Sequence, residues 1–329
     1  MPPMINAEQP LEVYFTVDVE VWCDGWQDID RKFPEAFRRY VYGPTPQGDC
    51  ALPLTVRVLQ DHGLVGSFFV EPLFATRFGL EPLAEVVDLL AAAGQEVQLH
   101  MHTEWVDEAL EPLLPGAQRK RQYLRDFDLD EQTLLLAAGR RLLQAAGAPP
   151  VSAFRAGGFG FNRDTLTALQ RNAISVDASY NASMLGPSSG VMPGVTLTDS
   201  SLIDGVLELP MTVFTDGRSQ LRHAQLTACS WAEMESLLWQ ALRHGQRSFV
   251  ILSHNFELLN VQKNRLDKLV VSRFRKLCRF LEQHSKDFKL CRTAAGPTRR
   301  EGPQPEPLRS GRLLTAWRMG EQAWRRSYG

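Results

Sequence analysis

Residues 11–20 read LEVYFTVDVE, and this stretch decides how the rest of the chain is interpreted. Its first half has the composition of a buried strand, and its second half carries two carboxylates, Asp18 and Glu20. Charged groups at the end of a buried strand are costly unless they are paired, bound to a metal or placed in a wet cleft. We therefore expect a functional site at the carboxyl end of this strand.

Three further segments repeat this arrangement, in which polar side chains follow an apolar run. They are HMHTE at 100–104, FRAGG at 154–158 and SHNFE at 253–257, which follow strand-like runs at 96–99, 151–153 and 248–252. One such segment would be unremarkable. Four that together supply carboxylates, imidazoles and a guanidinium predict a single assembled site.

Composition is that of an ordinary globular protein. The chain has 329 residues, of which 44% are hydrophobic and 22% charged, and it is long enough to bury a large core. The formal net charge of −2 argues against a nucleic-acid binder. Five scattered cysteines without CxxC spacing predict free thiols. Neither a signal peptide nor a transmembrane run is visible, so we expect a cytoplasmic protein.

Strand-like and helix-like segments alternate along most of the chain. Helical spacing is found at 52–62, 83–93, 130–146, 164–171, 231–243 and 267–284. Residues 22–49 and 181–201 have the composition of loops. The alternation predicts an α/β fold with a mostly parallel sheet, and polar groups at the strand ends fit a barrel whose site lies on that face.

The composition changes near the C-terminus. Residues 296–312 are rich in Gly, Pro, Arg and Glu, which predicts a linker between a barrel at 1–295 and a helix at 313–329. In that helix, Trp317 and Trp324 stand among arginines. Several roles remain open for it: docking on the barrel, contact with a protein partner or a membrane surface, or a frayed end.

The period of a strand brings the candidate metal ligands together. Residues two apart point to the same side, so Asp18 projects with Glu20, and His100 projects with His102. Carboxylate oxygens and imidazole nitrogens that converge at one cleft suit zinc or another first-row divalent ion. Glu104 could add a further ligand where its strand gives way to a loop.

Arg155 stays charged, so at a buried strand end it requires a carboxylate partner, and Asp18 is the candidate. A bonded arginine would hold that carboxylate ionised and aimed. Gly157, which follows closely, permits the backbone to approach a neighbouring group or a substrate. We expect Arg155 and Asp18 to act as one unit.

His254 follows an apolar strand and can titrate near neutral pH, which suits a general acid that protonates a leaving amine. Asp177 is expected to fix the tautomer of His254, and Glu257 is either a supporting partner or a substrate contact. Trp22 and Trp105 flank the clusters and could stack on a sugar ring.

Together, the four clusters resemble the motifs of the polysaccharide deacetylase superfamily, the NodB-like carbohydrate esterases, from about residue 11 to 290. The resemblance implies an incomplete (β/α)7-type barrel with parallel strands and five motifs at strand ends. D-V-E at 18–20 is similar to the first motif, whose leading Asp is the general base, a role that falls on Asp18. D-V-E together with H-x-x-E at 254–257 is similar to a divergent branch found with surface-polysaccharide assembly.

The resemblance also implies a set of metal ligands. The family's first motif usually has a second Asp as a ligand, but Val19 stands in that place here and Glu20 is the nearest substitute. The second motif has two metal-binding histidines four residues apart. His100 matches the first, Glu104 occupies the place of the second, and His102 lies between them. The expected ligands are therefore Glu20, His100 and either His102 or Glu104.

The remaining motifs assign the other catalytic groups. The segment at 154–157 resembles the third motif, whose Arg orients the base, and this role falls on Arg155. Asp177 fits the fourth motif loosely. The segment at 252–257 resembles the fifth motif, whose His acts as the acid, and this role falls on His254.

The resemblance implies a metal-dependent hydrolase, with zinc as the expected ion, that removes an N-acetyl group from an amino sugar in glycan or glycolipid synthesis. Its substrate would be a carbohydrate or a glycolipid. Two alternatives remain open. One is a hydrolase of another non-peptide C–N bond, such as a cyclic amide or ureide, because a fold does not fix a substrate. The other is a metal-free barrel that binds glycan or scaffolds a partner enzyme.

Overall fold

The computed structural model describes residues 9–116, 120–184, 191–260 and 265–328. Predictions for residues 1–8 and for part of the expected loop at 181–201 fall outside this range. The main sheet consists of β1 (Leu11–Val19), β4 (Ser67–Val70), β5 (Glu96–Met101), β6 (Ala153–Ala156), β7 (Val176–Asp177), β8 (Ser201–Ile203), β9 (Val206–Glu208), β12 (Ser248–His254) and β15 (Phe288–Leu290). Shorter strands are β2 (Pro44–Thr45), β3 (Gly48–Asp49), β10 (Val213–Thr215), β11 (Leu221–His223), β13 (Leu259–Asn260), β14 (Arg265–Leu266) and β16 (Leu308–Arg309).

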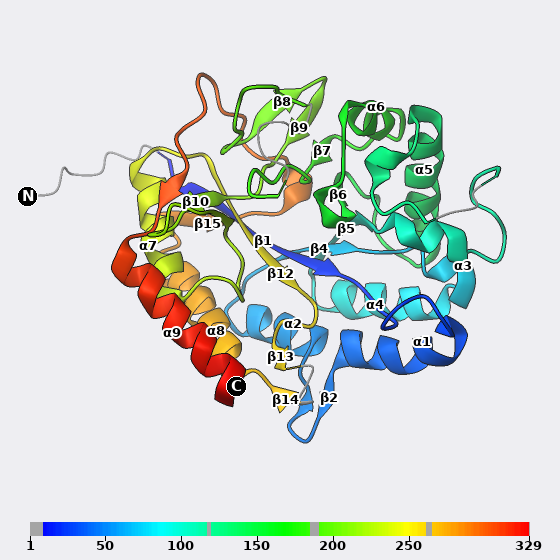
Figure 1. Ribbon diagram of the computed structural model, residues 1–329, viewed down its shortest axis with the longest axis horizontal. Coiled ribbons are helices and arrows are strands. Elements are labelled where there is room, and N and C mark those ends of the chain that lie inside the picture. Colours follow the sequence, from blue (N-terminus) through cyan, green and yellow to red (C-terminus); the bar gives the residue numbers. More distant parts are fainter. Residues whose placement is uncertain (1–8, 117–119, 185–190, 261–264, 329) are drawn as a thin grey trace, which may run out of the picture.

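The sheet is curled and open, with helices packed around it (Figure 1). Its strand order is β12-β1-β4-β5-β6-β7-β9-β8, and β15 also pairs with β1. Among the described strands of this sheet, the pairings are parallel except for that of β8 with β9. The predicted α/β fold with an incomplete parallel barrel is therefore confirmed.

The α-helices are α1 (Ile29–Phe37), α2 (Leu52–Asp61), α3 (Ala75–Phe78), α4 (Glu81–Ala92), α5 (Leu129–Ala145), α6 (Arg163–Arg171), α7 (Trp231–Arg243), α8 (Lys268–Gln283) and α9 (Arg312–Tyr328). The six predicted within the barrel are present with small shifts of their ends. Gly63, Gly94 and Gly147 follow α2, α4 and α5 with positive φ, as expected of glycines that stop helices.

The prediction of a loop over residues 22–49 is wrong. This segment contains α1 and a π-helical turn at Arg38–Tyr42. Ile29, Phe33 and Phe37 recur at helical spacing and are buried, so α1 packs its apolar side into the core. Pro34 lies inside the helix, where it removes a backbone donor, and this residue made the segment read as a loop.

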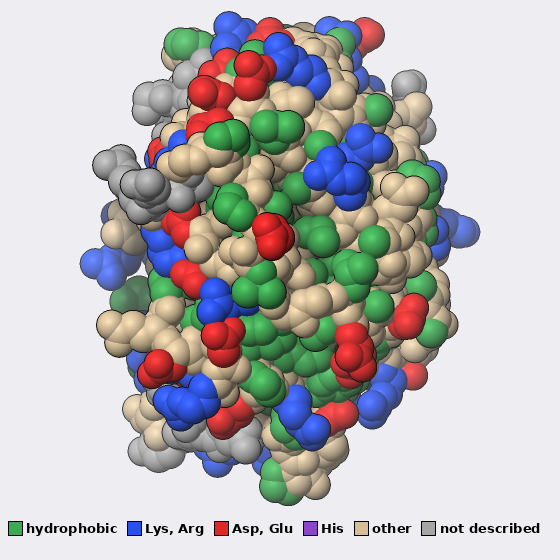
Figure 2. Space-filling view, turned by 90° about the vertical axis from the view of Figure 1, so that its right-hand side faces the viewer, with side chains coloured by type: hydrophobic (Ala, Val, Ile, Leu, Met, Phe, Trp, Pro, Cys, Tyr) green, Lys and Arg blue, Asp and Glu red, His purple; other side chains and the backbone are tan. Residues whose placement is uncertain are grey.

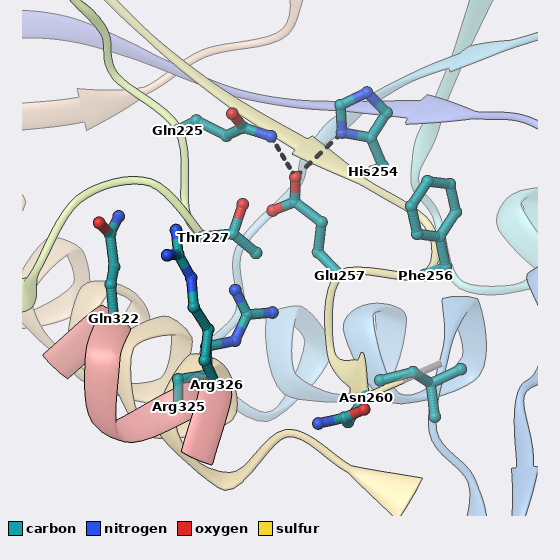
Figure 3. A pocket seen from close by; sticks show the side chains of 10 residues that line it. Gln225, Thr227, His254, Phe256, Glu257, Asn260, Gln322, Arg325 and Arg326 are labelled. Atoms are coloured by element: carbon teal, nitrogen blue, oxygen red, sulfur yellow. Dashed lines mark hydrogen bonds and ion pairs between the residues drawn. The ribbon is translucent and has the colours of Figure 1, made fainter. Parts of the chain in front are cut away.

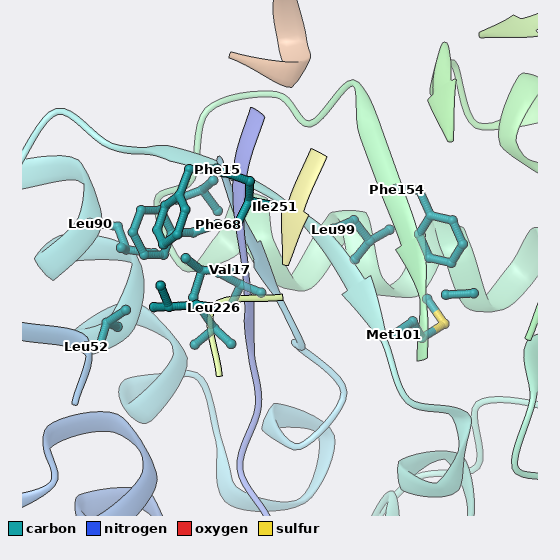
Figure 4. Close-up of a cluster of buried hydrophobic side chains, with 14 of the residues drawn as sticks. Phe15, Val17, Leu52, Phe68, Leu90, Leu99, Met101, Phe154, Leu226 and Ile251 are labelled. Atoms are coloured by element: carbon teal, nitrogen blue, oxygen red, sulfur yellow. The ribbon is translucent and has the colours of Figure 1, made fainter. Parts of the chain in front are cut away.

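Two apolar layers lie on the two faces of the sheet. Phe15 and Val17 of β1 pack with Phe68 and with side chains of the surrounding helices, such as Leu90 of α4 (Figure 4). The alternate residue Tyr14 belongs to a second cluster, together with Phe69, Ala153, Val176, Val250 and Leu252. Because β1 alternates between these layers, Thr16 and Asp18 project to the same face as Tyr14, inside the curled sheet.

The segment predicted as a linker lies along the barrel. Thr298 donates its backbone N–H to Glu12 at 2.9 Å, and Arg300 pairs with the buried Asp199 at 3.2 Å. Further on, β16 pairs in parallel with β10. The helix α9 follows and lies beside α7 (Figure 1), and its Glu321 pairs with Arg273 of α8. The division of the chain into barrel, linker and helix remains a prediction.

Charges of both signs are mixed on the molecular surface. Figure 2 shows one face on which basic and acidic side chains are interspersed, in keeping with the formal net charge of −2. Within the described ranges, no helix combines the length and the apolar character needed to cross a membrane.

Candidate active site

Strand register brings the four polar clusters to one edge of the sheet. Asp18 of β1 lies opposite His254 of β12 and Phe69 of β4. His100 of β5 lies opposite Arg155 of β6. Because all these strands are parallel, their carboxyl ends meet on one side, where β/α barrels carry their sites. The structure thus assembles the side chains that the sequence analysis grouped.

Asp18 and Arg155 form the predicted ion pair. Arg155 Nη1 lies 2.6 Å from Asp18 Oδ1, and the arginine side chain is 0% exposed. The same guanidinium donates to Thr16 Oγ1 and to the carbonyl of Ala178, each at 3.0 Å. Asp18 Oδ2 accepts no hydrogen bond from the described residues. The arginine therefore fixes one oxygen of the carboxylate and leaves the other available.

Glu20, His100 and His102 form a compact group of metal-ligand type. Glu20 Oε1 lies 3.0 Å from Nε2 of His100 and 3.0 Å from Nε2 of His102. One ligand atom from each residue lies within 4.8 Å of the others. Two imidazoles and one carboxylate are also a ligand set used by catalytic zinc sites. We expect this group to hold a divalent ion.

The far nitrogens of the two imidazoles face different groups. His100 Nδ1 lies 2.8 Å from the carbonyl of Arg155, so it donates its hydrogen there and leaves the Nε2 lone pair facing Glu20. His102 Nδ1 lies 3.4 Å from Glu104 Oε2, close enough for an ion pair, although neither atom has a hydrogen-bond partner among the described residues. Partners such as the one of His100 fix the tautomer of metal-binding histidines. Glu104 lies behind His102, outside the group of three.

Charge favours a cation among these three residues. Burial raises the pKa of Glu20, but His102 and His100 outweigh this effect and hold it well below its usual range. Burial lowers the pKa of His102, but the carboxylates of Glu20, Glu104 and Glu71 outweigh it and hold that pKa well above the usual range. The Glu20 carboxylate is therefore held in its ionised form, which is the form that can coordinate a cation.

His254 is held by Glu257. Its Nδ1 lies 2.9 Å from Glu257 Oε1, and Glu257 also accepts hydrogen bonds from Gln225 and Ser253 (Figure 3). A second group that could hold an ion joins His254 to Asp18 and Glu20, with one atom from each within 4.8 Å of the others. Burial lowers the pKa of His254, but Glu257, Glu20 and Asp18 raise it to about 9.

The prediction that Asp177 fixes the tautomer of His254 is wrong, because Glu257 occupies that position. Asp177 instead accepts a hydrogen bond from Ser179 Oγ at 2.5 Å and lies opposite Glu208 in the pairing of β7 with β9. Burial raises the pKa of Asp177 to about 6 and that of Glu208 well above its usual range. This buried acidic pair belongs to β7 and β9, whereas the partner of His254 is Glu257.

The two tryptophans have different surroundings. Trp22 donates its indole N–H to Glu20 Oε2 at 2.7 Å, and its ring lies 4.7 Å from that of His102. Trp22 is half-buried beside the metal-ligand group and can still face a sugar. Trp105 is 1% exposed and packs against Trp26. We therefore correct its expected role: Trp105 is a core residue with no free face for a substrate.

Gly157 supports the site in a way that its sequence context did not reveal. A Cβ at this position would lie 2.7 Å from His102 Nδ1 and 2.8 Å from the carbonyl of Met101. Real Cβ atoms do not approach other atoms so closely, so only glycine fits behind the His102 ring. Gly157 therefore packs against His102, and its expected contact with substrate remains a prediction.

Two supporting residues were missed from the sequence. Glu71 is buried after β4, accepts the backbone N–H of His102 and that of Leu73 at 2.6 Å, and burial raises its pKa to about 8. Asn255 donates to the carbonyl of Glu20 at 3.1 Å and accepts its N–H at 3.1 Å. The only sequence signal for either residue is a polar side chain directly after an apolar strand.

Comparison with known proteins identifies the fold. No family model and no curated protein matches the chain. Among solved structures, a protein assigned as a polysaccharide deacetylase from Mycobacterium smegmatis superposes with a TM-score of 0.54 at 18% identity, covering 91% of this chain and 95% of the other. The chain therefore has the fold of polysaccharide deacetylases, as the resemblance implied.

Solved structures that match with lower TM-scores are also described as carbohydrate esterases or as CE4 family members. A family 4 carbohydrate esterase from Streptomyces lividans has a TM-score of 0.42 at 10% identity, covering 88% of this chain and 98% of the other. A CE4 family pseudoenzyme from Bacillus anthracis has a TM-score of 0.42 at 13% identity, covering 86% and 64%. Scores and identities of this size carry no argument about activity.

Proposed function

We propose that the protein is a metal-dependent deacetylase that removes an N-acetyl group from an amino sugar. The observation that carries this proposal is the sharing of Glu20 between two adjacent groups, one with His100 and His102, the other with Asp18 and His254. A candidate metal site, a candidate base and a candidate acid therefore surround a single point. Metal-assisted hydrolysis of an amide can use these three components together.

Asp18 is the proposed general base. Its Oδ1 is fixed by Arg155 at 2.6 Å, whereas its Oδ2 is open for a water molecule. Arg155 is a positioning residue, since it is buried behind the carboxylate and supplies a fixed positive charge. In the reaction, water adds its oxygen to the acetyl carbon and gives a proton to Asp18.

His254 is the proposed general acid. Glu257 holds its Nδ1, so the opposite nitrogen is directed toward the group formed with Asp18 and Glu20. Cleavage of the C–N bond releases acetate, and His254 donates a proton to the departing amine. Glu257 keeps the ring aligned during this transfer, which is the role the sequence analysis had left open between support and substrate contact.

Glu20, His100 and His102 would hold the ion, for which zinc is the proposed identity. When bound, such an ion polarises the carbonyl and lowers the pKa of water. The donor types fit, because two imidazole nitrogens with far-side partners and one carboxylate oxygen converge at one place. Trp22, beside this group, is the proposed stacking surface for the sugar ring.

Acetate release from a panel of N-acetylated amino sugars tests this function, with zinc content measured on protein purified without chelator. The expected result is zinc near one equivalent and acetate release that chelation abolishes and zinc restores. Cyclic amides and ureides belong in the same panel. Turnover of those compounds alone would favour a hydrolase of another C–N bond. Glycan binding by protein that holds no metal and releases no acetate would favour a binding barrel.

The proposal extends to the setting of the reaction. We propose a cytoplasmic enzyme of glycan or glycolipid synthesis, because all five cysteines are free thiols and the formal charge is small. Cell fractionation with an antibody to the chain tests this location. Recovery of the protein outside the cytoplasmic fraction, or its recovery with disulfides, would contradict it.

We further propose that α9 contacts an anionic membrane surface. Leu313, Trp317 and Trp324 are 87%, 63% and 51% exposed, and the helix α8 contributes Lys268, Arg275, Lys276 and Arg279 to a basic surface hollow. Exposed aromatic and basic side chains are typical of interfacial helices. Sedimentation with vesicles of phosphatidylglycerol, compared with phosphatidylcholine, is the test. Equal binding to both, or to neither, would leave a protein partner as the occupant of this surface.

A further inference from the structure

A second feature of the active-site edge is a cavity of about 570 Å³ that begins at His254 and extends to the end of α9 (Figure 3). His254 and Glu257 line it on the barrel side, and Gln322, Arg325 and Arg326 line it on the helix side. The C-terminal helix therefore forms one wall of a space that opens directly beside the proposed general acid.

The helix side of this cavity is rich in hydrogen-bond donors. Figure 3 shows Gln322, Arg325 and Arg326 extending from α9 toward Thr227 and Glu257. Guanidinium groups, amides and a hydroxyl can together satisfy the several oxygens of a phosphate. The two oxygens of a carboxylate would leave some of these donors unused.

The two arginines differ in their partners. Arg325 pairs through Nε with Asp267, which also accepts the backbone N–H of Val270 at the start of α8. Arg326, by contrast, is exposed and pairs with no carboxylate in the described part of the chain. Arg325 thus anchors the end of α9, and Arg326 brings an uncompensated positive charge to the rim of the cavity.

The cavity offers little negative charge to compete with an anion. Among the described lining residues, Glu257 is the one acidic side chain. Its oxygens already accept hydrogen bonds from Gln225, Ser253 and His254. An anion that enters from the α9 side therefore meets donors first.

We propose that this cavity is a phosphate subsite, so that the substrate is an N-acetylated amino sugar that carries a phosphate group. Arg326 is its principal ligand, with Gln322 and Thr227 as further donors. This inference rests on the proposed deacetylase function for the identity of the sugar, but not for the binding of phosphate. The subsite holds the phosphate on the His254 side of the reacting amide.

A variant of Arg326 can be tested because α9 is fixed at other points. Arg318 is buried and lies 2.8 Å from Asp216 and 3.1 Å from Glu233. Arg273 of α8 pairs with Glu321 at 2.5 Å. Loss of the exposed Arg326 side chain leaves these contacts intact. Arg312 is an exposed arginine at the other end of the same helix and serves as the matched control.

The first experiment compares Arg326→Gln, Arg326→Lys and Arg312→Gln on N-acetylglucosamine and on N-acetylglucosamine 1-phosphate. Loss of a charge-assisted contact is expected to raise KM for the phosphorylated sugar roughly ten- to hundredfold in Arg326→Gln. kcat, and KM for the neutral sugar, should not change. Arg326→Lys should recover part of the affinity, and Arg312→Gln should match wild type. Equal effects on both sugars would overturn the subsite.

A second experiment does not depend on turnover. In an Asp18→Asn background, calorimetry measures binding of inorganic phosphate, of N-acetylglucosamine 1-phosphate and of an N-acetylated uronic acid. Phosphate binding that Arg326→Gln abolishes supports the subsite even if no acetate is ever released. Binding of the uronic acid alone would replace phosphate with a carboxylate and overturn the proposal, as would absence of binding by all three.

A third experiment distinguishes a lipid-linked phosphate from a soluble one. Vesicles that contain phosphatidic acid present the group on a lipid, and inorganic phosphate presents it free in solution. Competition between the two that depends on Arg326 would indicate a lipid-linked sugar phosphate as the natural substrate. The other outcome is that free phosphate binds in calorimetry while vesicle binding is unaffected by phosphate and by Arg326→Gln. That combination would assign the phosphate to a soluble sugar.

Discussion

Two buried arginine–carboxylate pairs in this molecule have similar geometry and different surroundings. Arg155 and Asp18 meet at 2.6 Å at the carboxyl end of β1, and Arg318 and Asp216 meet at 2.8 Å where α9 docks. All four side chains are almost fully buried. The second carboxylate is saturated, since its Oδ1 also accepts the backbone N–H groups of Arg218 and Gln220.

The two ion pairs differ in the carboxylate oxygen that the arginine does not contact. Asp18 keeps Oδ2 free of hydrogen bonds from the described residues, and His254 lies nearby. Asp216 has no such capacity, and Arg318 also pairs with Glu233. An ion pair whose hydrogen-bonding capacity is full stabilises a structure. One that faces other titratable groups with an unused oxygen is equipped for chemistry.

The largest effect is expected from Asp18→Asn. The amide retains the size of the carboxylate but takes up a proton poorly, so kcat should fall by about 10²- to 10⁴-fold. Acetate release under saturating zinc measures this loss, and thermal unfolding checks that the fold persists. His254→Ala should lose activity over a similar range. If Asp18→Asn retains wild-type kcat, the contrast between the two pairs fails.

Arg318→Met should affect stability instead of activity. Removing one partner of a buried pair leaves an uncompensated carboxylate, so the free energy of unfolding should fall by about 3–5 kcal/mol. Urea denaturation measures this change, and Arg312→Gln on the exposed part of α9 is the control. A large fall in kcat for the folded variant would show that Arg318 also serves the site.

Glu104→Gln should weaken the ion without abolishing turnover. Its carboxylate orients His102 from behind, at 3.4 Å from Nδ1. Loss of such a partner typically lowers metal affinity about 10- to 100-fold. Zinc titration should show this shift, and excess zinc should restore kcat. Activity that excess zinc cannot restore would indicate that Glu104 is a direct ligand.

The smallest effect concerns the buried acids. Burial raises the pKa of Asp177 to about 6 and that of Glu208 further above its usual range. Acids with raised pKa in the folded state contribute stability at low pH that is lost as pH rises through those values. Glu208→Gln should therefore lessen the decline in the free energy of unfolding between pH 5 and pH 8, which urea denaturation at several pH values measures. A decline identical to wild type would show that the pair carries no proton.

Much of the fold and of the site's composition was predictable from local sequence. Period-two alternation placed Asp18 with Glu20 on one face, and parallel strands brought them to His100, Arg155 and His254. The alternation of side chains along a strand and the parallel direction of the strands each depend on a few residues. Hydrophobic patterning specifies these two features most strongly.

The errors arose where long-range packing decides. Glu257 and Asp177 are both acids near the end of a strand, and only the arrangement of β12 relative to β7 determines which one reaches His254. Trp105 and Trp22 have similar sequence contexts, but one is turned into the core by the helix at Thr103–Glu108. The helix α1 was not predicted because it contains Pro34, and proline inside a helix is uncommon.

The position of β1 has a consequence for how the chain is made. Among the described strands β1 comes earliest in the chain, yet it pairs with β12 along Glu12–Asp18 and with β15 along Leu11–Val13. On its other edge β1 pairs with β4, which follows soon after, but β12 and β15 leave the ribosome more than two hundred residues later. During synthesis the edge of β1 that later pairs with β12 and β15 therefore stays unpaired. An unpaired apolar strand edge is prone to aggregation. Truncation before residue 248 would leave that edge open and the proposed base without its acid.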